Sequence, residues 1–167
     1  MTGTDADPEC VRLASAFGPA ALLDIRDPVA QFGADSFDVV ACFHVLEHVD
    51  NPKAVLNALR MIARKYVVLA VPNLRKLVHP FVRTISIEGF NEGHLQSWDH
   101  WHLLNLAERH CGLKLVEWGF DATLLPGFHR FAERCLGMRA TIWLETGVFA
   151  RLFPFHGVSV LGLFRRA

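Results

Sequence analysis

Two short, almost uninterrupted apolar segments, separated by one segment of helical length, limit what this chain can fold into. They are residues 37–43 (FDVVACF) and residues 66–71 (YVVLAV), both rich in valine and other strand-forming residues. Strands that are buried on both faces have this composition, which is typical of parallel sheets covered by helices. The two segments therefore predict an α/β protein.

The segment between these two predicted strands reads as an amphipathic helix. Asp50 or Asn51 can cap its first turn, and Pro52 suits the first helical position. One apolar stripe then follows at helical spacing, formed by Val55, Leu56, Leu59, Ile62 and Ala63. Strand, helix and strand in this order predict a βαβ unit with a right-handed crossover.

The rest of the chain continues the alternation. Residues 11–17 and a segment capped by Asp99 and stopped by Gly112 are predicted helices. Further strands are expected at residues 20–23, 113–118 and 158–164, with an apolar helical insertion at about 124–155. The 167 residues give room for one domain, so we expect a single three-layer α/β domain with a mostly parallel sheet.

Charge, hydropathy and cysteine usage exclude several classes. The 17 basic and 17 acidic residues give zero net charge, so no nucleic-acid partner is expected. No apolar run is long enough to span a bilayer, and the N-terminus lacks the pattern of a signal peptide. The cysteines stand alone and form no CxxC pair, which favours a reducing cytoplasm: Cys10, Cys42, Cys111 and Cys135.

Polar residues follow several of the predicted strands. In open α/β sheets, ligands bind beyond the carboxyl ends of the strands. The positions to inspect are therefore Asp5, Asp24, residues 43–48 and residues 72–73.

These positions carry a family resemblance. Residues 36–52 (SFDVVACFHVLEHVDNP) are the most specific part of it. They resemble the fourth strand and following loop of class I S-adenosylmethionine-dependent methyltransferases of the type 11 and type 23 kind. Other segments match in the same order: 3–14 (second strand and its helix), 22–28 (third strand), 66–73 (fifth strand) and 93–118 (a later helix and the sixth strand).

The resemblance implies S-adenosylmethionine as cofactor and assigns its adenosine end. Asp5, with Ala6 beside it, would accept hydrogen bonds from the ribose hydroxyls. Asp24 would accept from the adenine amino group, and Ile25 would cover the adenine face and offer its backbone N–H. The alternative for Asp5 and Asp24 is turn or cap chemistry, which their residue type also suits.

The resemblance also assigns the reacting end. Phe43 and His44 would line the methionine part of the cofactor. His94 lies in the loop where substrate enters in this fold, and a histidine there could take the proton of an acceptor hydroxyl. We therefore expect O-methyl transfer to a small-molecule or lipid-like acceptor, with His94 as the candidate base. A structural role for His94 is the alternative.

One departure from the family concerns the start of the chain. The family's first strand and glycine-rich turn should precede Asp5, but only MTGT does so. A strand and a helix, at least ~30 residues, would be missing from the middle of the sheet. A truncated gene, a late start codon or a decayed copy would each explain this. We expect the 167-residue chain to bind the cofactor poorly.

Two rival functions remain open. Residues 44–48 (HVLEH) match the H-x-x-E-H zinc-hydrolase motif, which requires a long helix and a further acidic ligand. Here the motif follows a strand, so no metal site is expected, and Glu47 and His48 would orient the loop. The other rival is a non-catalytic, degenerate methyltransferase domain that binds a partner. A strand and glycine-rich turn encoded in frame upstream would favour an enzyme fragment over it.

The insertion at about 124–155 is more apolar than a connection requires. Four arginines outnumber its two glutamates: Arg130, Arg134, Arg139 and Arg151 against Glu133 and Glu145. Apolar and cationic residues together suit a lid over an apolar acceptor, or peripheral contact with a membrane. The alternative is a pair of helices packed on the sheet or on a second subunit.

Overall fold

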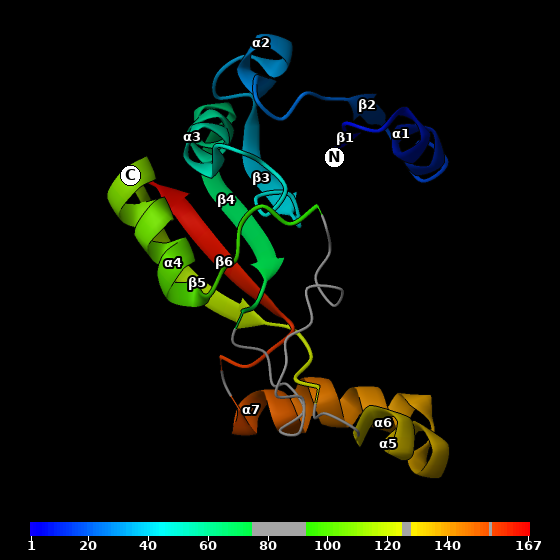
Figure 1. Cartoon of the computed structure of the whole chain (residues 1–167). Coiled ribbons are helices and arrows are strands. Elements are labelled where there is room, and N and C mark those ends of the chain that lie inside the picture. The colour runs from blue at the N-terminus through cyan, green and yellow to red at the C-terminus, as the bar shows by residue number, and fades with distance from the viewer. Residues whose placement is uncertain (75–92, 125–127, 154) are drawn as a thin grey trace.

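The computed structural model describes residues 1–74, 93–124, 128–153 and 155–167, and it contains two separate sheets. The larger sheet has the strand order β3–β4–β6–β5 (Figure 1). Its strands are β3 (Phe37–Phe43), β4 (Ala63–Pro72), β6 (Ser159–Arg166) and β5 (Leu113–Phe120). β3 and β4 are parallel, whereas β6 runs antiparallel to both of its neighbours. The α/β prediction is confirmed, with a sheet that is parallel in part.

The predicted βαβ unit is present at one edge of this sheet. Helix α3 (Pro52–Ile62) joins β3 to β4. The Asn51 side chain accepts a hydrogen bond from the Ala54 N–H at 3.0 Å and so caps the helix. Pro52 needs no hydrogen bond for its nitrogen, so it occupies the first turn without loss.

The second helix on the sheet begins and ends where the sequence predicts. Asp99 caps α4 (His100–Leu104) by accepting from the His102 N–H at 2.9 Å. The helix continues as a π-helical segment, η2 (Asn105–His110). Gly112 follows with a φ of 63°, a left-handed conformation that glycine adopts without strain.

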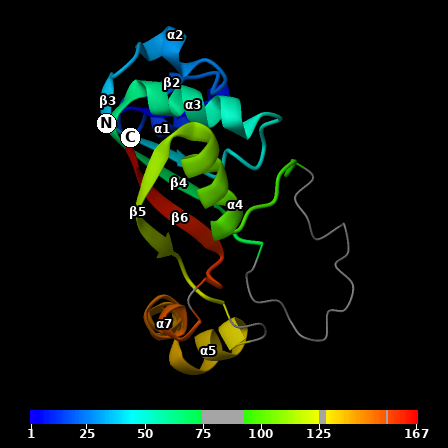
Figure 2. The same ribbon diagram turned by 90° about the vertical axis from the view of Figure 1, so that its left-hand side faces the viewer.

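One face of the larger sheet forms the core. Helices α3 and α4 lie on the same side of the strands (Figures 1 and 2). Their apolar stripes pack on the alternate strand residues that point to that side. The buried cluster includes Val40, Cys42, Leu46, Val55, Leu56, Leu59, Ile62, Val67, Leu69, Val71, Leu103, Ala107, Leu113, Val160 and Phe164.

The opposite face of the sheet is largely open in the described part of the chain. Val39, Phe43 and Tyr66 point to this side and keep 51%, 54% and 38% of their surface exposed. Apolar side chains of this size are usually covered in a sheet of this type.

The smaller sheet is a parallel pair at the N-terminus, set apart from the larger one in Figure 1. It consists of β1 (Gly3–Asp5) and β2 (Ala20–Leu22), joined by α1 (Pro8–Ala14). The sequence placed this helix at 11–17. It begins earlier because the Asp7 side chain caps it by accepting from the Glu9 N–H at 2.7 Å. A short helix that the sequence did not predict, α2 (Pro28–Phe32), leads on to β3.

The division between the two sheets leaves strand edges unpaired in the described part of the chain. In the described residues β1 pairs only with β2, and β3 pairs only with β4. Each strand therefore keeps one edge without a strand partner. Unpaired strand edges are unfavourable unless they are covered, and they invite pairing with another strand.

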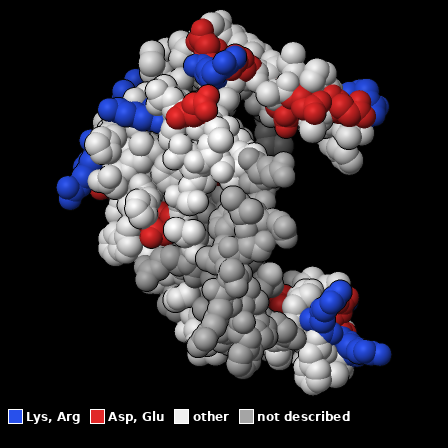
Figure 3. Space-filling view, in the orientation of Figure 1, with Lys and Arg blue, Asp and Glu red and all other residues white. Residues whose placement is uncertain are grey.

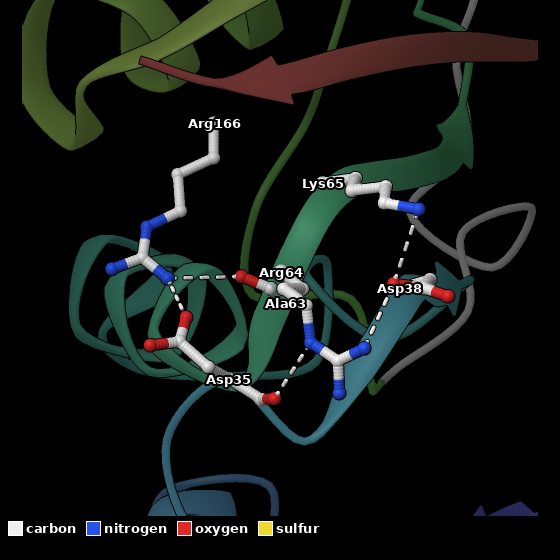
Figure 4. A network of polar contacts seen from close by, with 6 residues as sticks. All are labelled: Asp35, Asp38, Ala63, Arg64, Lys65 and Arg166. Carbon is white, nitrogen blue, oxygen red and sulfur yellow. Dashed lines mark hydrogen bonds and ion pairs between the residues drawn. The ribbon is translucent and has the colours of Figure 1, made fainter.

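Charged residues tie the strands together at the amino ends of β3 and β4 (Figure 4). Arg64 Nη1 lies 3.1 Å from Asp38 Oδ1, and Lys65 Nζ lies 3.4 Å from the same oxygen. Arg166, near the end of β6, contacts the Asp35 carboxylate and donates to the Ala63 carbonyl. These exposed pairs contribute little stability each. They occupy the end of the sheet opposite to the expected ligand edge.

The described part of the insertion is helical. It comprises α5 (Phe128–Leu136), α6 (Met138–Trp143), the π-helical η3 (Leu144–Phe149) and α7 (Ala150–Leu152). His129 Nδ1 lies 2.8 Å from Glu145 Oε1 and links the first of these helices to η3. The helices stand at the far end of the molecule from the N-terminus (Figure 1). Across the described ranges, no helix has both the length and the apolar character that crossing a membrane requires.

Candidate functional site

A cavity of about 640 Å³ lies between the N-terminal strand pair and the turn after β3. Its walls combine apolar side chains with carboxylate, guanidinium, imidazole and amide groups. The lining residues are Ala6, Leu22, Leu23, Asp24, Ile25, Arg26, His48, Val49, Asp50, Asn51, Ala54 and Val55. The volume is that of a site for a drug-sized or cofactor-sized molecule.

Three of the predicted cofactor residues, Ala6, Asp24 and Ile25, line this cavity. β1 and β2 are parallel and in register, with Asp5 paired to Leu22, so both strands end at the same edge. The backbone N–H of Leu23 donates to the Asp5 carbonyl at 2.9 Å and extends the pairing up to Asp24.

Asp24 is held as a carboxylate at the cavity wall. Its oxygens accept from the Arg26 side chain at 2.6–3.0 Å and from the Arg26 N–H at 3.0 Å. These hydrogen bonds lower the pKa of Asp24 to about 2. The Arg26 guanidinium has the larger effect and the Arg26 backbone N–H the next largest. The side chain is still 53% exposed, so a ligand can reach it. Asp24 therefore makes the local turn contacts that were the alternative to a cofactor role. These contacts leave its carboxylate accessible.

The other predicted cofactor residues lie outside the cavity lining. Asp5 is exposed at the end of β1 and accepts from the Asp7 N–H at 2.9 Å, in a local turn. Phe43 ends β3 and is 54% exposed. His44 follows it with a φ of 53°, a conformation that is unusual for a residue other than glycine. Their assignments to ribose and to the methionine end stay predictions.

In the turn after β3, the imidazoles of His44 and His48 lie near the buried carboxylate of Glu47. Glu47 is 1% exposed. His44 Nδ1 lies 3.3 Å from Glu47 Oε1, and His48 Nε2 lies 3.9 Å from the same oxygen. Residues 44–48 form a turn rather than a helix, and α3 starts only at Pro52. The helical setting that the zinc-hydrolase motif requires is therefore lacking.

The predicted base His94 belongs to the same cluster. Its ring packs edge-on against that of His48, with centroids 4.8 Å apart. The loop that carries it is tied to the turn, because the Glu47 carbonyl accepts from the Leu95 N–H at 2.7 Å and from the Gln96 N–H at 3.1 Å. His48 Nδ1 also lies 2.8 Å from the Gly93 carbonyl oxygen. His94 is thus fixed beside the turn after β3, about 50 positions along the chain from it.

A second, smaller pocket of about 350 Å³ lies where the insertion returns to the sheet. It is mainly aromatic and is lined by His100, Trp101, Trp118, Phe155 and His156. The histidine cluster connects to this region through His44 Nε2, which lies 3.5 Å from Ser159 Oγ at the start of β6.

Sequence reasoning missed several residues of the cavity and of the cluster. Arg26, Asp50 and Asn51 line the cavity, although the latter two were interpreted only as a helix start. Glu47 and His48 lie in the 43–48 segment that was expected near a ligand site because it follows a strand, but the only role predicted for them was to orient the loop.

Comparison with known proteins identifies the family. Residues 1–117 match the methyltransferase-domain family. The chain therefore belongs to the class I S-adenosylmethionine-dependent methyltransferases, whose cofactor is S-adenosylmethionine. No curated protein matches the chain.

Solved structures show the same fold at low sequence identity. An S-adenosylmethionine-dependent methyltransferase from Archaeoglobus fulgidus is 15% identical with a TM-score of 0.65, over 99% of this chain and 75% of that one. One from Mesorhizobium loti is 14% identical with a TM-score of 0.59, over 99% and 80%. Magnesium protoporphyrin IX methyltransferase from Synechocystis PCC 6803 with bound SAH is 15% identical with a TM-score of 0.56, over 99% and 64%.

The residues of the large cavity fit the adenosine end of this cofactor. Asp24 offers an ionised acceptor, and Ile25 and Val49 offer apolar walls for a flat ring. Among the described residues that line the cavity there is no glycine, so these residues do not provide the close backbone approach that a glycine turn allows.

Proposed function

We propose that this chain is a methyltransferase domain that holds the adenosine end of S-adenosylmethionine in the 640 Å³ cavity. The observation that carries the proposal is the convergence of Ala6, Asp24 and Ile25, from the ends of β1 and β2, on one cavity. Asp24 would accept from the adenine amino group and Ile25 would cover the ring. Asp5 would bind the ribose hydroxyls from the rim, and Phe43 and His44 would face the methionine end.

The histidine cluster is the proposed place of proton transfer. When bound, S-adenosylmethionine supplies an electrophilic methyl group on a sulfonium. The methyl group would pass from this sulfonium to an acceptor oxygen, and S-adenosylhomocysteine would be released. His94 takes the proton of the acceptor hydroxyl, since it is fixed beside His48, which lines the cavity.

The acceptor is proposed to be apolar, at least in part. Two observations support this class: the mainly aromatic pocket of about 350 Å³, and the exposed side chains of the insertion. Phe131, Trp143 and Leu152 keep 65%, 64% and 65% of their surface exposed. Figure 3 shows lysine or arginine side chains on the same part of the molecule. Such a surface suits contact with a lipid or a membrane.

A methyl-transfer assay tests this function. The purified chain is incubated with methyl-tritiated S-adenosylmethionine and either hydroxylated lipids and isoprenoids or small polar acids. We expect label in the apolar pool, and loss of most of it in His94→Ala with cofactor binding unchanged. The exposed His110 on η2 gives a matched control, His110→Ala. Label only in the polar pool would contradict the acceptor class, and full activity of His94→Ala would contradict the base.

The divided sheet favours a second candidate, a non-catalytic domain that binds a partner. β1 and β3 each present an edge with no strand partner in the described ranges, and such edges can take up a strand from another chain. Cofactor binding without transfer to any pool, together with a stable complex isolated from the source cells, would favour this candidate over the enzyme.

A further inference from the structure

The Glu47 carboxylate poses a physical problem that the proposed methyl transfer does not solve. The side chain is 1% exposed, and among the described residues neither of its oxygens has a hydrogen-bond partner. A buried carboxylate normally has its charge compensated by hydrogen bonds, a cationic side chain or a metal ion. The groups nearest to it in the turn are imidazoles, at 3.3 Å (His44) and 3.9 Å (His48).

Three side chains of the cluster place ligand atoms around one point. Glu47, His48 and His94 each offer one ligand atom, and these atoms all lie within 4.8 Å of one another. Ligand atoms at about 2.0–2.1 Å from one tetrahedral ion lie about 3.4 Å apart. Closure from separations of up to 4.8 Å therefore requires each ligand atom to move inward by about 0.7 Å, which side-chain rotation can supply.

The protonation of His48 suits metal binding. The Gly93 carbonyl, 2.8 Å from His48 Nδ1, can only accept a hydrogen bond, so Nδ1 carries the proton. The lone pair of Nε2 is then directed toward the Glu47 side, where the nitrogen lies 3.9 Å from Oε1. A backbone carbonyl that holds the distal nitrogen of a ligating histidine is a common supporting contact in metal sites.

The backbone holds the third ligand in place. The Glu47 carbonyl accepts from the N–H groups of Leu95 and Gln96, the two residues after His94. Gly93, the residue before it, contacts His48. His94 is thus fixed on both sides, which lowers the entropy cost of assembling a site from two loops.

We propose that Glu47, His48 and His94 bind one divalent transition-metal ion. Two imidazole nitrogens and one carboxylate oxygen suit zinc and its neighbours, whereas magnesium and calcium prefer oxygen ligands alone. The site differs from a helical H-x-x-E-H arrangement, because its second histidine comes from a distant loop and His44 is not one of the three. His48 is exposed and also lines the large cavity, so the open coordination position lies next to the cofactor site.

The ion would also change the role of His94. With its lone pair on the metal, His94 is a ligand rather than a base. An acceptor hydroxyl at the open position would lose its proton more readily, because the ion stabilises the oxyanion. This role rests on the proposed methyl transfer, whereas the binding of the ion does not.

Metal titration of the full chain tests the site without cofactor or acceptor. Protein stripped with a chelator is titrated with Zn²⁺ by calorimetry and with Co²⁺ by visible absorption. We expect one equivalent of Zn²⁺ with micromolar or tighter affinity, a Co²⁺ absorption band that Zn²⁺ abolishes, and no competition by Mg²⁺. His48→Ala, His94→Ala and Glu47→Gln should each weaken Zn²⁺ binding by about tenfold or more.

Several results would overturn the site. These are the lack of stoichiometric Zn²⁺ binding, equal competition by Mg²⁺, or unchanged affinity in His94→Ala. His110→Ala, which removes an exposed histidine elsewhere, should bind as the unaltered chain does. If Glu47→Gln does not fold, His94→Ala decides alone, because it alters a partly exposed loop residue. Cofactor binding measured in parallel separates failure of the metal site from failure of the proposed function.

Discussion

At the scale of single residues, Asp24 is the best-defined part of the candidate cofactor site. Its carboxylate is ionised, exposed and oriented by Arg26. Orientation matters because a fixed acceptor loses less entropy when a ligand's amino group binds. Sequence reasoning found this residue from its place after a short apolar run. The contact with Arg26 could not be predicted, because two adjacent charges in a turn often point apart.

Replacing Asp24 should weaken cofactor binding. Asp24→Ala removes one charge-assisted hydrogen bond, which predicts about a tenfold loss of affinity for S-adenosylhomocysteine in calorimetry. Because Arg26 lowers the pKa of Asp24 to about 2, the carboxylate is charged at every pH well above that value. Its contribution should therefore stay constant from about pH 8 to pH 5 and be lost only as the pH falls through the folded-state pKa.

The matched control for this variant is Asp38→Ala. It removes the same charge from an exposed residue at the amino end of β3, far from the cavity. Equal affinities of the unaltered chain and Asp24→Ala would exclude Asp24 as an adenine ligand.

The reactivity of the four cysteines depends on their burial and on the charges near them. Burial raises the pKa of Cys42 to about 12, and burial also raises the pKa of Cys111. The nearby Asp5 carboxylate raises the pKa of the exposed Cys10. At neutral pH a thiol reagent should therefore modify Cys135 first and Cys10 more slowly, with Cys42 and Cys111 reacting only on unfolding. Mass spectrometry of the time course checks this order, and rapid modification of Cys42 would contradict the packing of β3.

At the scale of elements, the unit β3–α3–β4 was predicted closely, but the burial of Glu47 in the turn after β3 was not. Asn51 and Pro52 indicate the start of a helix, and the segments on either side of that helix indicate buried strands. The local sequence and the overall fold therefore favour the same structure. Glu47 was different, because a glutamate in a turn is normally exposed. Its burial depends on the 93–96 loop, which is distant in sequence. The π-helical turn η2 has no sequence signal that we could use.

Strand β6 should tolerate no side chain at Gly162. A Cβ built there would lie 2.4 Å from the Phe164 ring and 3.0 Å from Trp118. The two rings pack edge-to-face and Phe164 is fully buried, so neither can move freely. Gly162→Ala should lower the free energy of unfolding by about 1–3 kcal/mol in urea denaturation.

The neighbouring strand offers a control for this substitution. At Gly119, on β5, the nearest atom to a built Cβ is 3.4 Å away, which is close to ordinary contact. Gly119→Ala should change stability by much less than Gly162→Ala. Similar losses in both variants would show that strand propensity, rather than ring packing, decides the cost.

At the scale of the whole molecule, residues from both sheets line one cavity. The N-terminal pair supplies Ala6 and Asp24, and the larger sheet supplies the turn with His48 and, through it, the loop with His94. The fold class and the succession of strands and helices along the chain were predictable from the sequence, because buried strands and amphipathic helices alternate along it. The division into two sheets was not predicted from the sequence, which indicated one sheet.

The open construction predicts weak cofactor binding. The cavity lacks a glycine in its lining, and its walls come from two sheets that share no strand pairing in the described ranges. A site whose parts are not held together loses affinity to the entropy of assembling them. The measurement that tests the cofactor site must therefore detect weak as well as tight binding.

Nuclear magnetic resonance of the ¹⁵N-labelled chain, titrated with S-adenosylhomocysteine, is that measurement. Saturable shifts are expected for the backbone amides of Ala6, Ile25, Val49 and Asn51, which line the cavity, and no shifts for Asp38 and Arg64 at the opposite end of the sheet. Asp24→Ala should require about tenfold more ligand for the same shifts. Shifts confined to residues outside the cavity, or no shifts at millimolar ligand, would contradict a methyltransferase cofactor site in this chain.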